Sequence, residues 1–240
     1  MTEIRTEAVP LRDGHVLPLT VAEPVSQIRG GIVVLHEARG VTDAVRRLVA
    51  GLAGEGWLAV APHLYHRSGT DELQPSAGDD EVRDQVSQLD GAEVLADTDT
   101  AFGWLAQRDV ASDQMGVVGF DLGGSVALLI ATQRSLGAAV TVAGGGIMEP
   151  LSSGLPSLVE AAPSIGCPWL GLYGEPPETG NGQSEAGETP VQRLRAAAAS
   201  SQVATDVVTY PDTAYRFDSD PEAAADAWQR TLNWFDSHLR

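Results

Sequence analysis

Apolar and polar positions follow two different periods along this chain. Short runs rich in aliphatic and β-branched residues are typical of strands, and they are separated by segments with apolar residues every three or four positions, typical of amphipathic helices. The runs predict strands at residues 4–9, 16–21, 31–35, 57–61, 115–120, 138–143, 169–174 and 203–210. The intervening segments predict helices at residues 43–55, 81–107, 125–133, 191–199 and 222–239. We therefore expect an α/β fold, doubly wound, with a mostly parallel sheet of about eight strands and helices on both faces.

Two stretches interrupt this alternation. Residues 62–80 are polar and too long for a simple connection, and they follow a central strand, where loops often line a site. Residues 175–189 are rich in Gly, Pro and Glu, which predicts a mobile surface loop. The chain has 240 residues and shows no internal repeat, so we expect a single domain over residues 1–240.

The charge balance narrows the range of partners. Fifteen Lys and Arg residues stand against 33 Asp and Glu residues, giving a formal net charge of −18. Such a charge disfavours nucleic acid and anionic membrane surfaces, so we expect neither as a partner. The single cysteine, Cys167, allows no intramolecular disulfide, and residues 1–5 lack an apolar signal core. We expect a cytoplasmic protein, a monomer or a homodimer, that binds a small molecule.

The most informative motif is a strand, turn and helix around residue 121. The apolar strand at 115–120 runs into Gly-Phe-Asp-Leu-Gly-Gly at 119–124 and then into a small, apolar helix. This context is typical of a nucleophile elbow, in which a strained turn lifts one side chain above the sheet. A dinucleotide-binding fingerprint does not fit, because the glycine spacing and the late position of the motif are wrong. The lifted residue here is Asp121, where serine or cysteine is usual.

Four stretches, in order, resemble the dienelactone hydrolase family of the α/β-hydrolase fold. They are Leu-His-Glu-Ala-Arg-Gly at 35–40, Ala-Pro-His-Leu-Tyr at 61–65, the elbow at 119–124, and Leu-Tyr-Gly-Glu at 172–175 with Tyr-Pro-Asp-Thr-Ala-Tyr-Arg-Phe at 210–217. The resemblance spans roughly residues 16–239. It implies a carboxymethylenebutenolidase-like hydrolase of lactones and related esters that uses a Cys-His-Asp triad, without a cofactor or metal, and it implies that Glu37 contacts the residue at the elbow.

Each triad position nevertheless departs from the pattern that the resemblance implies. Asp121 stands in the nucleophile position, Tyr215 in the histidine position and Pro177 near the acid position, with Glu178 beside it as a substitute acid. The backbone N–H groups of Ala38 and Leu122 would still form the oxyanion hole that the resemblance implies, since backbone donors do not depend on side-chain identity. We therefore expect a weak or inactive hydrolase, a pseudoenzyme, with a pocket for a small carbonyl-bearing or acidic ligand.

Two alternatives remain open. Asp121 could itself be a nucleophile toward esters, lactones or haloacids, although such enzymes need a histidine, and only His63 and His66 could approach the elbow. The protein could instead bind a partner through its acidic surface. A metal held by Asp121 and Glu37 is the weaker option, because these carboxylates lack dedicated ligand spacing.

Further candidate residues flank the expected pocket. Tyr215 and Arg216 offer a phenol and a fixed positive charge, or else Tyr215 packs and Arg216 pairs with a neighbouring aspartate. The other residues that we expect to bind substrate are His36, Ala38, Tyr65, Arg67 and Leu122. For Arg67 a solvated loop position is the competing interpretation, and for His36 a structural role.

Overall fold

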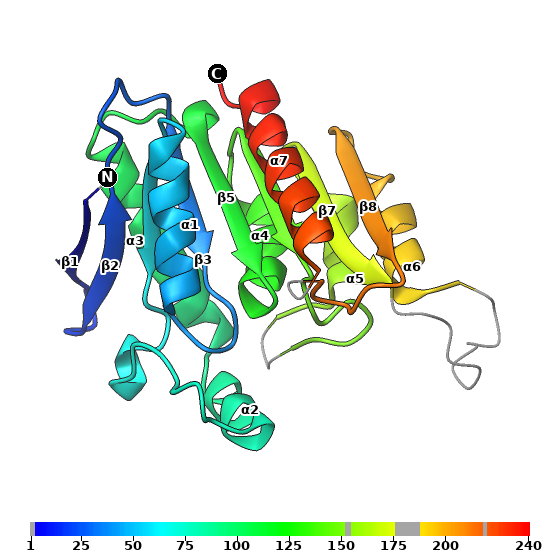
Figure 1. The fold of residues 1–240 in the computed structure, drawn as a ribbon, viewed down its shortest axis with the longest axis horizontal. Coiled ribbons are helices and arrows are strands. Elements are labelled where there is room, and N and C mark those ends of the chain that lie inside the picture. The colour runs from blue at the N-terminus through cyan, green and yellow to red at the C-terminus, as the bar shows by residue number, and fades with distance from the viewer. Residues whose placement is uncertain (1–2, 152–154, 176–187, 218–219) are drawn as a thin grey trace.

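A single eight-stranded sheet forms the centre of the molecule (Figure 1). A computed structural model describes residues 3–151, 155–175, 188–217 and 220–240. The strand order is β1-β2-β4-β3-β5-β6-β7-β8; β1 pairs with β2 and β2 with β4 antiparallel, and the other pairs are parallel. The strands are β1 Ile4–Pro10, β2 Val16–Ala22, β3 Gly31–Leu35, β4 Leu58–Pro62, β5 Met115–Phe120, β6 Ala138–Val142, β7 Trp169–Glu175 and β8 Thr205–Pro211. This confirms the predicted mostly parallel sheet.

Helices cover both faces of the sheet. The helices are α1 Asp43–Gly54, α2 Asp79–Ser87, α3 Gly91–Ala106, α4 Leu122–Gln133, α5 Leu158–Ala161, α6 Pro190–Ala198 and α7 Pro221–His238. In Figure 1, α1 and α7 lie on one face and α3, α4 and α6 on the other, whereas α2 lies beyond the edge of the sheet near the carboxyl ends of the strands. None of the helices in the described ranges is long and apolar enough to cross a membrane.

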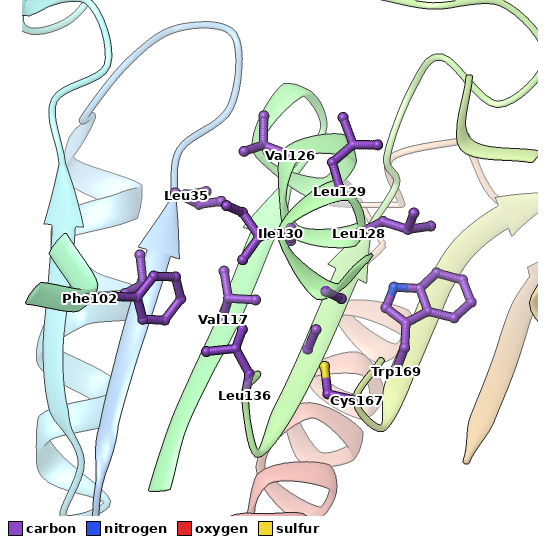
Figure 2. Close-up of a cluster of buried hydrophobic side chains, with 14 of the residues drawn as sticks. Leu35, Phe102, Val117, Val126, Leu128, Leu129, Ile130, Leu136, Cys167 and Trp169 are labelled. Carbon is purple, nitrogen blue, oxygen red and sulfur yellow. The ribbon is translucent and has the colours of Figure 1, made fainter. Parts of the chain in front are cut away.

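Alternation along the parallel strands divides the core into two layers. Val33 and Val117 are buried with the α3, α4 and α6 layer, whereas Ile32 and Val118 are buried with α1 and α7. Both faces of these strands are therefore apolar, as expected for strands covered by helices on both sides. Figure 2 shows α4 packed on the first layer through Val126, Leu128, Leu129 and Ile130. A helix so apolar on all sides is fixed in position, which matters because it begins at the elbow.

The structure corrects the predicted helix at residues 81–107. Two helices, α2 and α3, replace it, because Asp90 starts a new helix: its carboxylate accepts hydrogen bonds from the backbone N–H groups of Ala92 and Glu93. Such a cap satisfies the first N–H groups of a helix and fixes its starting point. The predicted helix at 125–133 also begins earlier, at Leu122, since the elbow turn leads directly into it.

The carboxyl ends of the parallel strands bring distant segments together. Residues 36–38 follow β3, residues 121–124 follow β5, residues 143–146 follow β6 and residues 212–217 follow β8. In open parallel sheets ligands bind at this edge, because the connecting loops there come from several strands. Most of the loop predicted at 175–189, including Glu178, lies outside the described residues.

Candidate active site at the elbow

Asp121 stands on a strained turn between β5 and α4. Its φ of 53° and ψ of −113° are rare for a residue with a side chain. The turn is held from both sides, because the Asp121 N–H donates to the Val142 carbonyl oxygen at 2.9 Å and the Ser125 N–H donates to the Asp121 carbonyl oxygen at 3.1 Å. A strained conformation persists where the surroundings determine it in this way, and here they present the carboxylate above the sheet.

Glycines make the turn possible. A Cβ at Gly119 would lie 1.9 Å from the Gly123 carbonyl oxygen, and one at Gly123 would lie 2.3 Å from the Leu35 carbonyl oxygen. The backbones of β5, α4 and β3 thus approach closer than any side chain would allow. The Gly123 N–H donates to the His36 carbonyl oxygen at 3.1 Å, which ties the elbow to the segment after β3.

The Asp121 carboxyl group experiences opposing influences. Burial raises its pKa above the ordinary value, and the charge of Glu37 acts in the same direction. The charge of Arg216 and the backbone N–H groups of Ala38 and Leu122 lower it. These two amides are the donors that the sequence assigned to an oxyanion hole. In this structure both amides lie near enough to the Asp121 carboxyl group to lower its pKa.

Glu37 and Arg216 form an ion pair beside Asp121. A guanidinium nitrogen of Arg216 donates a short hydrogen bond to Glu37 Oε2, and its Nη1 lies 3.9 Å from Asp121 Oδ2. Arg216 is therefore at the site, whereas Asp218, one of the aspartates expected as an alternative partner, lies outside the described residues. One cation between two carboxylates lets both remain in a small volume without a metal ion. In the described ranges, no group of His, Cys, Asp and Glu side chains is arranged to hold a metal.

Tyr215 occupies the remaining side of the site. Its hydroxyl donates to the Gly144 carbonyl oxygen at 2.6 Å, and its ring packs against Tyr173 with centroids 5.8 Å apart. Burial raises the pKa of the Tyr215 phenol, and the charge of Asp121 raises it further. The Tyr215 phenol therefore keeps its proton near neutral pH and donates it in a hydrogen bond to a backbone carbonyl. It cannot act as a base in this state.

A cleft of about 750 Å³ opens above the elbow. Its lining at the elbow consists of Ala38, Asp121 and Leu122, and Leu151 also lines it. The α2 helix contributes the remaining lining residues, which sequence reasoning missed: Asp79, Val82, Arg83, Val86 and Ser87. The apolar spacing of Val82 and Val86, four residues apart, is the signal that could have identified this wall. The cleft has the size of a small-molecule pocket and a mostly apolar wall.

The structure does not bring all the predicted residues to the cleft. His36 is fully buried; its Nδ1 lies 2.7 Å from the Glu37 carbonyl oxygen and its Nε2 accepts from the Leu64 N–H at 3.2 Å. Burial lowers the pKa of His36 to about 4, so the ring is neutral and structural. Tyr65 is also buried, and its hydroxyl donates to the Ala38 carbonyl oxygen at 2.8 Å. The expectation that these two side chains contact substrate does not agree with this burial; they support the Ala38 segment instead.

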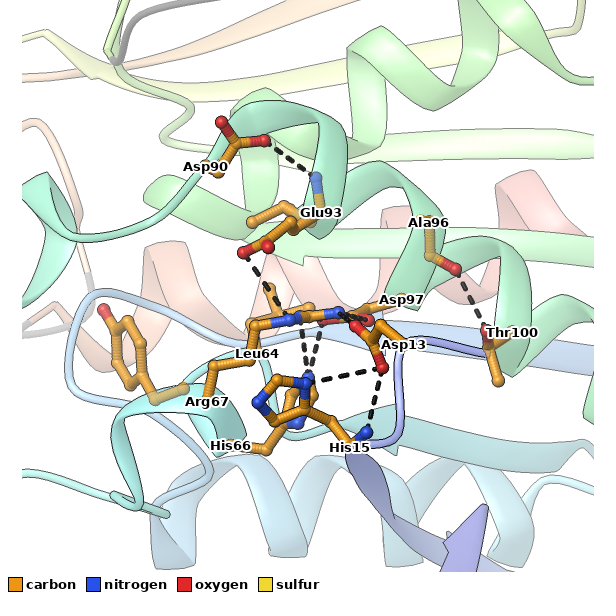
Figure 3. Close-up of polar contacts among 12 residues, drawn as sticks. Asp13, His15, Leu64, His66, Arg67, Asp90, Glu93, Ala96, Asp97 and Thr100 are labelled. Atoms are coloured by element: carbon orange, nitrogen blue, oxygen red, sulfur yellow. Dashed lines mark hydrogen bonds and ion pairs between the residues drawn. The ribbon is translucent and has the colours of Figure 1, made fainter. Parts of the chain in front are cut away.

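Arg67 and two histidines likewise have other partners. Arg67 donates to Asp97 and Asp13, and His66 Nε2 lies 2.9 Å from Asp97 Oδ2 (Figure 3). His63 is held between Thr20 and Asp71. Arg67 is therefore not part of the lining of the elbow cleft. Among the described residues, no imidazole is hydrogen bonded to Asp121, and Glu178 is outside the described part of the chain.

The sheet order, the strained turn after β5 and the cleft above it define an α/β-hydrolase fold. The sequence profile of the dienelactone hydrolase family matches residues 17–239. This chain belongs to the dienelactone hydrolase family.

Similar proteins agree with this assignment. A Yersinia pestis protein provisionally named a carboxymethylenebutenolidase is 31% identical over 235 residues, covering 94% of this chain and 85% of that protein. The carboxymethylenebutenolidase of Pseudomonas putida is 30% identical over 154 residues, covering 61% of this chain and 64% of that protein. A crystal structure from Klebsiella pneumoniae, provisionally named a dienelactone hydrolase, superimposes with a TM-score of 0.84 at 29% identity, covering 99% of this chain and all of that one.

Proposed function

We propose that this protein is a dienelactone-hydrolase-like protein in which the hydrolytic reaction of the family is lost or greatly weakened, and that its cleft binds a small carbonyl-bearing ligand. One observation carries the proposal: the residue on the elbow turn is a carboxylate with no described base hydrogen bonded to it, and the phenol at the histidine position donates to the Gly144 carbonyl oxygen instead. Acyl transfer needs an activated nucleophile, a base and free oxyanion donors. The first two of these requirements are not met by the residues at positions 121 and 215.

The charges of the cleft favour a neutral ligand over an acidic one. Asp121 and Asp79 line the cleft, while Arg83 pairs with Asp80 and Arg216 with Glu37. A second carboxylate would have to compete with Asp121 for the amides of Ala38 and Leu122. Because burial raises the pKa of Asp121, its carboxyl group is protonated at a higher pH than that of an exposed aspartate. The protonated carboxyl group can donate a hydrogen bond to a carbonyl oxygen.

Ester hydrolysis tests the loss of turnover. The wild-type protein and Asp121→Asn are incubated with 4-nitrophenyl acetate and with a panel of unsaturated lactones. We expect equal, background rates for both. The double variant Asp121→Cys with Tyr215→His asks whether the cleft still accepts such substrates, and we expect it to exceed the wild type. Wild-type turnover that disappears in Asp121→Asn would overturn the proposal.

A second candidate function follows from the amides that face the Asp121 carboxylate. A carboxylate needs no base to attack a saturated carbon: an oxygen of Asp121 forms a bond to the carbon, the carbon–halogen bond breaks with its electron pair, and halide leaves. Hydrolysis of the resulting ester needs an activated water. Among the described residues, no imidazole is hydrogen bonded to Asp121 to activate one. We therefore infer a single turnover with haloacids or alkyl halides that ends in a stable adduct.

Intact-protein mass spectrometry decides this second candidate. After incubation with chloroacetate or 1-bromobutane, one added group mapped to Asp121, with one equivalent of halide released, would support it. Asp121→Asn is the matched control and should remain unmodified. Absence of an adduct after long incubation would eliminate the nucleophile, and continued halide release would show a complete catalytic cycle.

A further inference from the structure

A second cavity lies on the opposite side of the Glu37–Arg216 pair from the cleft. It measures about 450 Å³ and runs between α1 and α7, which lie on the same face of the sheet on either side of β5 (Figure 1). Its lining is Glu37, Ala44, Val45, Arg47, Leu48, Gly51, Phe120, Arg216 and Trp228. We refer to it as the α1–α7 groove. Its volume is that of a small-molecule pocket.

One face of α1 forms the first wall of the groove. Ala44, Arg47, Leu48 and Gly51 recur at intervals of three and four residues, so their side chains lie on the same side of the helix. Gly51 has no side chain, and a Cβ there would lie 3.5 Å from the Trp228 ring, in ordinary contact. The indole of α7 therefore closes the groove over Gly51 without a clash.

Aromatic surface and positive charge meet in this groove. Phe120 and Trp228 are both partly buried and pack on the α1 and α7 core, leaving a portion of each ring accessible. Arg47 is exposed and forms no ion pair with any described residue, in contrast to its neighbour Arg46, which pairs with Asp43 and Glu72. A cation beside apolar and aromatic surface is what an amphipathic anion requires.

The charges around the groove favour an anion over a cation. Among the described residues of the lining, Glu37 is the one acidic side chain, and it bonds Arg216. Arg216 lies between Glu37 and Asp121, so Arg47 supplies the positive charge of the described lining that no printed ion pair offsets. A local positive site on a strongly negative protein selects its ligand by short-range contacts, because the overall field repels anions.

We propose that the α1–α7 groove binds a small amphipathic carboxylate, whose charged group pairs with Arg47 and whose apolar body packs against Leu48, Phe120 and Trp228. This inference does not depend on the proposed function, because Asp121, Leu122 and the α2 wall take no part in the groove. Binding should therefore persist in Asp121→Asn, whatever the outcome of the ester and adduct experiments.

Calorimetry with a charge series tests the proposal. The probes are 4-phenylbutyrate, its neutral amide and 4-phenylbutylamine, at low ionic strength. We expect saturable one-site binding of the acid, at least about tenfold weaker binding of the amide, and no binding of the amine; a charge-assisted pair of about 1.4 kcal/mol corresponds to this factor. Absence of acid binding at millimolar concentration, or equal binding of acid and amine, would overturn the proposal.

Matched variants locate the site. Arg47→Gln should weaken binding of the acid about tenfold, whereas Arg46→Gln, one residue away on the same helix, should leave it within about twofold. Ala44→Phe, which fills the groove from an exposed helix position, should abolish binding, and Val86→Phe, which narrows the elbow cleft, should not. Equal losses in Arg46→Gln and Arg47→Gln, or a loss only in Val86→Phe, would place the acid elsewhere and contradict the inference.

Discussion

Asp97 and Asp121 each lie near an arginine, but they differ in the hydrogen-bonding capacity that they keep for a ligand. Asp97 is 1% exposed, and both of its oxygens are used: Oδ2 by His66 and by Arg67 at 2.5 Å, and Oδ1 by Arg67 at 3.1 Å (Figure 3). The Asp121 side chain is 29% exposed and Arg216 Nη1 stands 3.9 Å away. The same residue types thus form a saturated cluster in one region and an incompletely paired one in the other.

The difference shows how burial divides structural charges from functional ones. A buried carboxylate that accepts from a bidentate guanidinium and an imidazole has no remaining capacity, and its role is to hold α3 against the 3₁₀ turn at His66–Ser68. The Asp121 carboxylate faces a cleft and has a raised pKa. Among the described residues no imidazole is hydrogen bonded to Asp121, and His66 belongs to the structural cluster around Asp97.

Asp97→Asn should produce the largest effect, because it removes a buried carboxylate from the buried His66 ring and the half-buried Arg67 guanidinium. Removing one partner of a buried charge pair costs about 3 kcal/mol or more. For a domain of this size that corresponds to a melting temperature lower by roughly 10 °C. Differential scanning calorimetry measures it. Asp99→Asn on the same helix is the control: its pair with Arg134 is 59% exposed at the aspartate, and its loss should cost less than about 0.5 kcal/mol. Equal losses would remove the contrast between the two regions.

Tyr215→Phe should have an intermediate effect. It removes the hydrogen bond from the phenol to the Gly144 carbonyl oxygen and should destabilise the fold by about 1 kcal/mol. If Tyr215 only supports the loop after β6, any background ester hydrolysis stays unchanged. Tyr210→Phe, whose hydroxyl donates to Asp226 away from the cleft, is the matched control. A fall in hydrolysis confined to Tyr215→Phe would show that the phenol handles protons, and the elbow would then be an active site.

The fold could be predicted because its signals are local. Apolar runs of five to seven residues predict the strands. The glycines at 119, 123 and 124 indicate the turn that lifts Asp121. The prediction of a single helix at 81–107 was wrong for a local reason as well. A new helix starts at Asp90-Gly91, but the residues around this start are polar, so the hydrophobic pattern does not mark it. Boundaries elsewhere moved by a few residues, as at β8.

The site was harder to predict because its pairings are long range. Glu37 and Arg216 are separated by 179 positions, and nothing in either segment indicates the other. Arg67 looked equally suited to the cleft, and its partner Asp97 looked like one of several acidic residues on a helix surface. Only the folded arrangement decides which cation reaches the elbow, which histidine is buried and which helix forms the cleft wall.

Asp121→Asn should have the smallest effect on stability, and its sign tests the electrostatics of the elbow. The pKa of Asp121 is raised above 3.8 in the folded state, so the folded protein binds this proton more tightly than the unfolded chain. The group therefore contributes stability that is fully present below pH 3.8 and is lost as the pH rises through the folded pKa. Above the folded pKa, ionisation of Asp121 lowers the free energy of unfolding relative to a neutral side chain at this position.

Asparagine cannot ionise, so the free energy of unfolding of the variant should rise relative to that of the wild type as the pH increases from about 4. Near neutral pH the difference should be constant and less than about 1 kcal/mol in favour of the variant. Urea unfolding at several pH values measures this difference. Asp79→Asn, which changes an exposed aspartate of the same cleft, is the matched control. A variant less stable than the wild type at neutral pH would mean that Arg216 and the two amides outweigh burial. Asp121 would then be a saturated carboxylate like Asp97, and the elbow would have no capacity left for a ligand.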